Sequence, residues 1–128
     1  MRLLLDTHVL VWWLTDAAEL PAHMRDLITT ADNDVFVSAV SCWEIAVKVR
    51  AGKWPEAAGL VPGLVSVLGE AQFSGLPISI AHAEAAGLLD IAHKDPFDRL
   101  LAVQAITENL TFLSVDPVFR QVVGLKVL

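Results

Sequence analysis

Cysteine is almost absent from this chain of 128 residues, in which Cys42 is the only one. A single cysteine cannot form an internal disulfide, so we expect a protein of a reducing compartment, the cytoplasm. Long apolar runs are also missing, since charged residues interrupt each run well before the roughly 20 residues that a membrane span needs. The apolar run after Arg2 is too short for a signal peptide. The sequence therefore predicts no membrane association.

Charge is sparse and of unfavourable sign for a simple nucleic-acid-binding protein. Charged residues make up 19% of the chain against 55% hydrophobic residues, which predicts one domain, residues 1–128, with a substantial core. The net charge of −6 lacks the basic footprint of most nucleic-acid-binding proteins. A bound divalent cation would invert the local charge of an acidic pocket and hold phosphate there. The overall acidity of the chain therefore argues against a nuclease without excluding one.

Two common kinds of site lack their sequence signatures. The chain has no glycine-rich phosphate loop. Its histidines do not have the spacing of paired metal ligands, so we expect each of them to lie at the surface or to support a site without binding metal. His8 and His93 are the histidines nearest to acidic residues in the sequence. Carboxylates without a Cys/His cluster indicate Mg²⁺, or Mn²⁺, rather than Zn²⁺.

Short apolar runs alternate with helical stretches along the chain. We expect strands at 2–5, 35–37, 76–78, 111–113 and 125–127, and helices at 9–14, 21–30, 41–50, 81–91 and 96–109. The stretch 56–72 is mostly helical in pattern but interrupted by Pro62 and Gly63, and Gly52 ends the helix before it. This alternation predicts an α/β fold with a mainly parallel sheet covered by helices on both faces.

Carboxylates follow the predicted strands or begin the predicted helices. Asp6 directly follows the first strand and Asp116 comes soon after the strand at 111–113, so both are expected at the carboxyl edge of the sheet, where ligands bind. Glu44 follows an apolar run, and Asp95 and Asp98 lie three residues apart at a helix start. Clustered carboxylates repel one another, and a cation is the usual compensation. The pattern therefore predicts a hard-cation site.

Each acid also has an ordinary structural interpretation. Asp6 fits a helix cap, and the segment from Ser41 to Glu44 fits a capping box, in which Glu44 would bond back to the cap amide. Asp95 fits a helix cap, and Asp98 fits a first turn favoured by the helix dipole. Capping explains each residue singly, but it does not explain why these acids gather at one predicted edge of a small acidic domain.

Four segments carry a resemblance to a known family: Leu3–His8, Val37–Ala46, Asp95–Ala105 and Leu113–Asp116. In order and spacing they resemble the four acidic motifs of PIN-domain proteins, most closely the VapC toxins of bacterial toxin–antitoxin pairs. The resemblance implies a small three-layer α/β/α sandwich with a parallel sheet. It also implies Mg²⁺-dependent cleavage of an RNA substrate, a cognate antitoxin protein that occludes the site, and usually a homodimer.

The resemblance assigns Asp6, Glu44, Asp98 and Asp116 to the catalytic and metal-binding acids. Asp95 is the extra acid of an Asp-Pro-Phe-Asp variant, and it is open to three roles: metal ligand, support for a ligand, or helix cap. Metal-bound water would attack the phosphate, with Glu44 orienting or deprotonating it. Thr7 and Ser114 would be polar supports. Candidates for phosphate contacts are Lys48, Arg50, Lys53, Lys94 and Arg99.

Three other functions are weighed against this one. A haloacid-dehalogenase-type phosphotransferase needs a second Asp two residues after Asp6, where this chain has His8. A receiver domain needs paired acids after the first strand, where Asp6 is followed by Thr7. A PIN-like domain that has lost catalysis and only binds a partner protein is disfavoured by the intact acidic set.

The tryptophans suggest a covered surface. Trp12, Trp13 and Trp54 are poor core candidates from their positions, whereas Trp43 is a plausible core residue. Together with a mean hydropathy of +0.56, this predicts apolar surface that another chain covers. We expect a homodimer, and also an antitoxin segment that packs on Trp-lined surface and places a basic side chain toward the acidic pocket.

Overall fold

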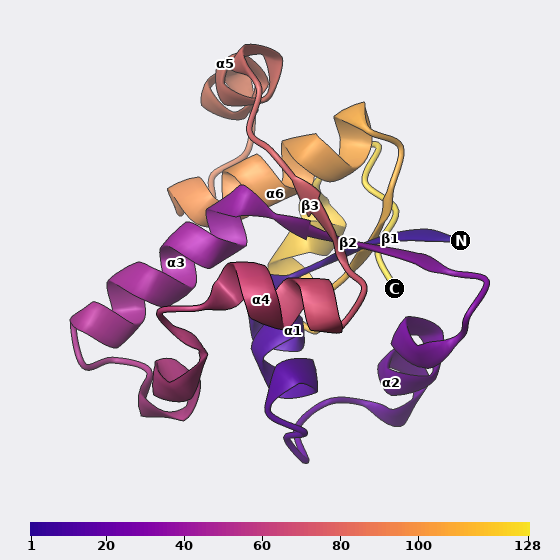
Figure 1. Ribbon diagram of the computed structural model, residues 1–128. Coiled ribbons are helices and arrows are strands. Elements are labelled where there is room, and N and C mark those ends of the chain that lie inside the picture. Colours follow the sequence, from indigo (N-terminus) through magenta and orange to yellow (C-terminus); the bar gives the residue numbers. More distant parts are fainter.

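Four parallel strands form the centre of the computed structural model, which describes residues 1–128 (Figure 1). They are β1 (Arg2–Leu5), β2 (Asp34–Ser38), β3 (Ser74–Leu76) and β4 (Thr111–Leu113), in the order β3-β2-β1-β4. In the register of the sheet, Leu4 of the central strand lies opposite Phe36 on one side and Phe112 on the other. The parallel arrangement brings the carboxyl ends of β1 and β4 to the same edge.

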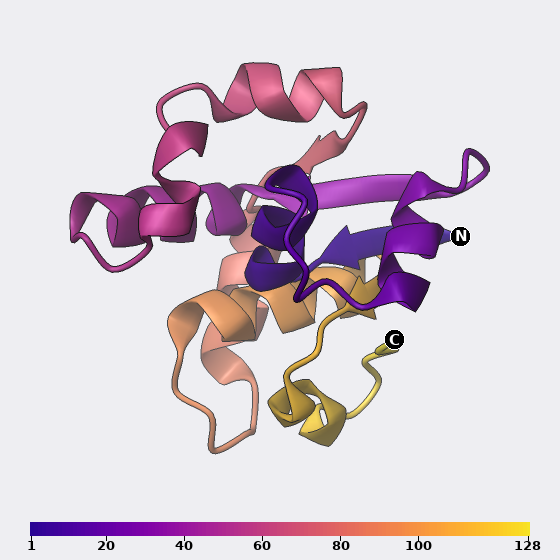
Figure 2. The same ribbon diagram turned by 90° about the horizontal axis from the view of Figure 1, so that it is seen from below.

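Helical segments connect these strands and cover both faces of the sheet (Figures 1 and 2). The α-helices are α1 (Thr7–Leu14), α2 (Ala22–Thr29), α3 (Ala39–Arg50), α4 (Leu64–Glu70), α5 (Ile80–Leu88) and α6 (Pro96–Thr107), and the 3-10 helices are η1 (Pro55–Leu60) and η2 (Pro117–Gln121). In Figure 1, α5 and α6 lie above the sheet and α1, α2 and α4 below it. None of the helices is both long enough and apolar enough to cross a membrane.

Alternation along β1 divides the interior into two cores. Leu3 and Leu5 point to the face packed by α1, α2 and η1, while Leu4 points to the face packed by α6 and η2. All three leucines are fully buried, as expected of a central parallel strand covered on both faces. The predicted three-layer α/β/α fold with a parallel sheet is therefore confirmed.

Several element boundaries differ from the expected ones. The third strand ends at Leu76 because Pro77, which has no N–H to donate, follows it. The segment 125–127 is not a strand, since it forms one isolated bridge, between Val127 and Phe112 of β4. Helix α5 ends at Leu88, before the predicted residue 91. The predicted division of 56–72 is confirmed, with the 3-10 helix η1 as its first piece.

The tryptophans reverse the expected order of burial. Trp43 is 55% exposed and meets the ring of Phe97 edge-on at 5.0 Å between ring centroids. Trp12, Trp13 and Trp54 are half-buried and pack against the core beneath α1. The prediction that Trp43 could be a core residue is wrong, because it lies on the outer face of α3.

Candidate functional site

A cleft of about 440 Å³ lies at the carboxyl ends of β1 and β4. All the acids predicted for the site line it, and with their neighbours they are Asp6, His8, Trp12, Glu44, Lys48, His93, Asp95, Asp98, Val115 and Asp116. These residues come from segments distant in the sequence, which the parallel sheet brings to one edge.

Asp6 follows β1 and is the most constrained acid of the cleft. It caps α1 by accepting a hydrogen bond from the Thr7 amide at Oδ1 (2.8 Å), and its Oδ2 accepts one from the Ser114 hydroxyl (2.6 Å). The side chain is almost completely buried. The pKa of Asp6 is raised from 3.8 to about 7, mainly by burial; the hydrogen bond from Ser114 acts against this rise, and the negative charges of Asp98 and Glu44 add to it.

Glu44 lies on α3 and does not belong to a capping box. Helix α3 begins earlier than predicted, at Ala39, and its N-cap is Ser38, whose side chain accepts a hydrogen bond from the backbone of the helix. The Ser41 hydroxyl instead shares a hydrogen bond with the Thr7 hydroxyl (2.9 Å). The buried carboxylate of Glu44 pairs through Oε2 with Lys48 Nζ at 2.7 Å, one helical turn later.

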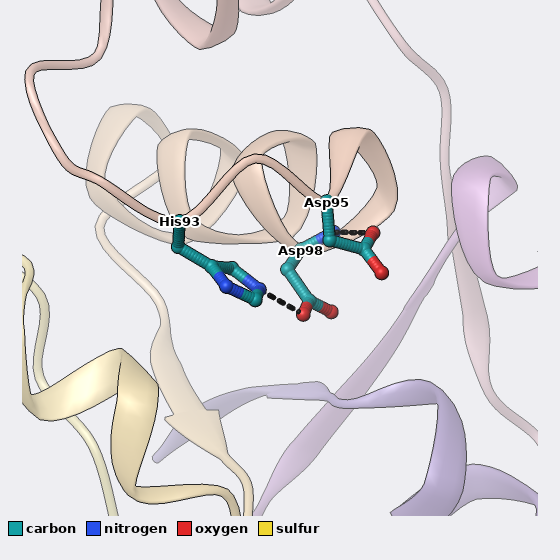
Figure 3. A group of neighbouring side chains, drawn as sticks. All are labelled: His93, Asp95 and Asp98. Atoms are coloured by element: carbon teal, nitrogen blue, oxygen red, sulfur yellow. Dashed lines mark hydrogen bonds and ion pairs between the residues drawn. The ribbon is translucent and has the colours of Figure 1, made fainter.

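Asp95 and Asp98 meet at the start of α6, as Figure 3 shows. Asp95 is the N-cap, and its Oδ1 accepts from the amides of Phe97 (2.9 Å) and Asp98 (3.2 Å). His93 Nε2 lies 2.7 Å from Asp98 Oδ2. Burial raises the pKa of Asp98, the hydrogen bond from His93 lowers it, and the charge of Asp95 raises it again. His93, Asp95 and Asp98 each offer one ligand atom, all within 4.8 Å of one another.

Asp116 lies at the outer rim of the cleft. It is exposed and caps η2 through Oδ1, which accepts from the Val118 amide at 3.0 Å. Its own amide donates to the Ser114 hydroxyl at 3.1 Å. Ser114 therefore connects the backbone of Asp116 with the carboxylate of Asp6.

The balance of charge in the cleft favours a bound cation. Among the residues that line it, five are carboxylates and the one permanently charged cation is Lys48, which Glu44 already pairs. No basic side chain forms an ion pair with the buried carboxylate of Asp6. The donor set is dominated by oxygen and suits a hard divalent cation such as Mg²⁺ or Mn²⁺.

Sequence reasoning missed two features of this cleft and misplaced one basic residue. The Glu44–Lys48 pair was detectable from its spacing, because residues four apart on a helix are neighbours. The sequence predicts that His93 lies near acidic residues, but its bond to Asp98 depends on how the loop folds. Arg99, a predicted phosphate contact, is not among the residues that line the cleft, and its guanidinium donates to backbone carbonyls at the end of α5 and in the loop before α6.

Solved structures share this fold at low sequence identity. The chain matches one from VapBC2 of Rickettsia felis bound to a DNA fragment from their promoter, with 18% identity, a TM-score of 0.71, and 100% and 98% of the two chains covered. It matches one from DNA-bound VapBC of Salmonella typhimurium with 17% identity, a TM-score of 0.69 and coverage of 100% and 97%. A chain of FitAcB from Neisseria gonorrhoeae matches with 16% identity, a TM-score of 0.64 and coverage of 98% and 95%.

A comparison with curated protein sequences finds no match. The family model described as the PIN domain matches residues 3–125, which is nearly the whole chain and includes every acid of the cleft. This chain therefore belongs to the PIN domain family.

Proposed function

We propose that this chain is a metal-dependent endoribonuclease, the toxin of a toxin–antitoxin pair, and that the acidic cleft is its active site. One observation carries the proposal. Five carboxylates from separate parts of the chain line a single cleft whose only lysine is already paired. Such a cluster is costly for a folded protein unless a cation compensates it.

Asp6, Asp98 and Asp116 would hold Mg²⁺ or Mn²⁺, with Glu44 and Asp95 completing the set. Bound there, the ion would polarise the scissile phosphate and make water a better nucleophile. The protein orients the acids: Thr7 and Ser114 hold the Asp6 carboxylate, and His93 holds that of Asp98.

Glu44 and Lys48, which both line the cleft, would act on the attacking water and on the phosphate, respectively. Glu44 Oε2 pairs with Lys48, and we infer that the other oxygen, Oε1, would orient an attacking water or accept its proton. Lys48 Nζ places a positive charge where a phosphate would lie, and it also lies over the ring of Trp54, 5.5 Å from the ring centroid.

The antitoxin would cover the cleft and its Trp-lined neighbour. Trp12 also lines an adjoining cleft of about 520 Å³, whose walls include Trp54, Glu19 and Glu56. Aromatic rings beside carboxylates suit a basic side chain, so a basic segment of an antitoxin would bind there and keep the acids from their metal. Exposed Trp43 would add to a homodimer interface. Residues 1–128 would form a single domain that acts in the cytoplasm.

Cleavage of RNA by antitoxin-free protein tests the proposal. Purified protein should cleave single-stranded or structured RNA with Mg²⁺ or Mn²⁺ and stop with EDTA, while DNA of the same sequence remains intact. Asp6→Asn or Asp98→Asn should abolish cleavage, whereas Asp32→Asn, at an exposed turn outside the cleft, should not. Persistent cleavage in EDTA, or equal activity of all variants, would refute the proposal. Absence of cleavage with either metal, together with tight antitoxin binding, would instead favour a PIN domain that only binds a partner.

A further inference from the structure

Arg99 uses every N–H group of its guanidinium on the protein backbone. Nε donates to the carbonyl of Ala86 (3.0 Å), Nη1 to those of Ile91 (3.3 Å) and His93 (3.0 Å), and Nη2 to those of Gly87 and Leu89. An arginine has five N–H donors, so these five bonds leave none for a substrate phosphate. No carboxylate forms an ion pair with Arg99.

The carbonyls that Arg99 binds belong to the end of α5 and to the loop 89–95. Ala86 and Gly87 lie in the last turn of α5, whereas the carbonyls of Leu89, Ile91 and His93 come from every second residue of the loop, as carbonyls on one side of an extended segment do. Within the loop itself, one backbone hydrogen bond forms, from the Ile91 amide to the Leu89 carbonyl. Arg99 is therefore the main source of hydrogen bonds to the backbone of this loop.

The loop delivers two side chains to the acidic cleft. His93 contacts Asp98, and Asp95 caps α6 beside it. Arg99 follows Asp98 in the first turns of α6, so the residue that supplies a carboxylate to the cleft is adjacent to the residue that holds the loop carrying His93. The bond from Arg99 Nη1 to the His93 carbonyl acts on the very residue whose ring contacts Asp98.

We propose that Arg99 is a positioning residue: its guanidinium holds loop 89–95 against α6 and thereby places His93 beside Asp98. The kinetic part of this inference rests on the proposed nuclease function. A phosphate-binding arginine would need a free N–H group and a position among the residues lining the cleft, and Arg99 has neither. A lysine cannot replace it, because three donors on one nitrogen cannot reach five carbonyls.

Trypsin cleavage after Lys94 tests the inference independently of any ribonuclease activity of the protein. Lys94 is exposed within the loop, and cleavage there requires the loop to open. In Arg99→Gln and Arg99→Lys, this cleavage should accelerate about tenfold, because proteolysis follows the population of the open state. Arg25→Gln is the matched control, since Arg25 also donates to a carbonyl, that of Ala17, but lies on α2. Unchanged cleavage after Lys94 in both Arg99 variants would overturn the inference.

Kinetics on RNA then separate positioning from substrate contact. Both Arg99 variants should lose about tenfold or more in kcat with KM nearly unchanged, because a misplaced group weakens the reaction more than binding. His93→Gln should give a similar loss, and the double variant should lose little more, because Arg99 acts through His93. Full activity of Arg99→Lys, or additive losses in the double variant, would refute this.

The salt dependence of RNA binding in EDTA completes the test. A lost phosphate contact would reduce the slope of log K against log salt concentration by about one, whereas loss of a positioning residue leaves the slope unchanged. A reduced slope would overturn the inference in favour of a phosphate contact. If wild-type protein cleaves no RNA, the proposed function fails, and the trypsin experiment still decides the role of Arg99.

Discussion

Removal of the Asp6 charge should stabilise the metal-free protein at neutral and alkaline pH. The carboxylate is almost completely buried, and burial raises its pKa to about 7. An unfolded chain would titrate the same group near its ordinary value of 3.8. Asp6→Asn keeps the shape of the side chain and remains uncharged at every pH, so it removes the cost of burying a charge.

The sign follows from proton binding in the two states. Between about pH 4 and pH 7 the folded protein holds a proton on Asp6 that the unfolded chain has released. The contribution of Asp6 to stability therefore falls as the pH rises through this window, and it is constant below and above it. A difference of about three in pKa corresponds to a total loss of about 4 kcal/mol.

Urea denaturation in EDTA at pH 5 and pH 8 measures the effect. The hydrogen bond from Ser114 is stronger to the charged carboxylate than to the neutral one, and this difference is already contained in the pKa of Asp6, so it adds no separate pH dependence to the comparison. The free energy of unfolding of wild type relative to Asp6→Asn should fall by about 3 kcal/mol from pH 5 to pH 8. Saturating Mg²⁺ at pH 8 should raise the stability of wild type more than that of the variant, because the cation replaces the missing proton. A difference between the two proteins that is independent of pH would refute the reasoning.

Three further substitutions test other parts of the structure. Ser114→Ala removes the hydroxyl that donates to Asp6 and should cost about 1.5–3 kcal/mol in urea denaturation at pH 8 and less at pH 5, where the acceptor is largely neutral; an equal loss at both pH values would contradict this. Lys48→Met removes the partner of Glu44, so calorimetry should show tighter Mn²⁺ binding while RNA cleavage falls, and weaker Mn²⁺ binding would contradict the charge balance described for the cleft. Leu4→Ala opens a cavity beneath β1 and should cost about 2–5 kcal/mol by urea denaturation, without changing the pH dependence.

Short-range patterns predicted the positions of most elements. The apolar runs of β1, β2 and β4 are each followed by a polar or acidic residue, and the structure places these run ends at one sheet edge. The acids therefore met in one cleft as the parallel arrangement required. Strand β3 lies at Ser74–Leu76 and not at the predicted residues 76–78, because Pro77 cannot donate a backbone hydrogen bond to a neighbouring strand.

Long-range pairing accounts for what local patterns missed at α3. Ser41 and Glu44 have the spacing of a capping box, but Ser38 caps the helix, because the end of β2 feeds directly into it. The Ser41 hydroxyl is then used on Thr7, far away in sequence. Because Glu44 does not cap the helix, its carboxylate can line the cleft. The predicted acidic cluster therefore forms although the predicted capping box does not.

The role of Arg99 shows the limit of reading side chains from sequence. A basic residue next to a predicted catalytic acid suggests a phosphate contact, because both belong to one motif in the chain. The partners of Arg99 are carbonyl oxygens, which every residue possesses, so no pattern of side chains marks them. Only the path of the chain through the end of α5 and the loop 89–95 reveals that five carbonyls converge on one guanidinium. Charge near a site is thus ambiguous between binding substrate and holding the site together, and counting the donors that remain free distinguishes the two.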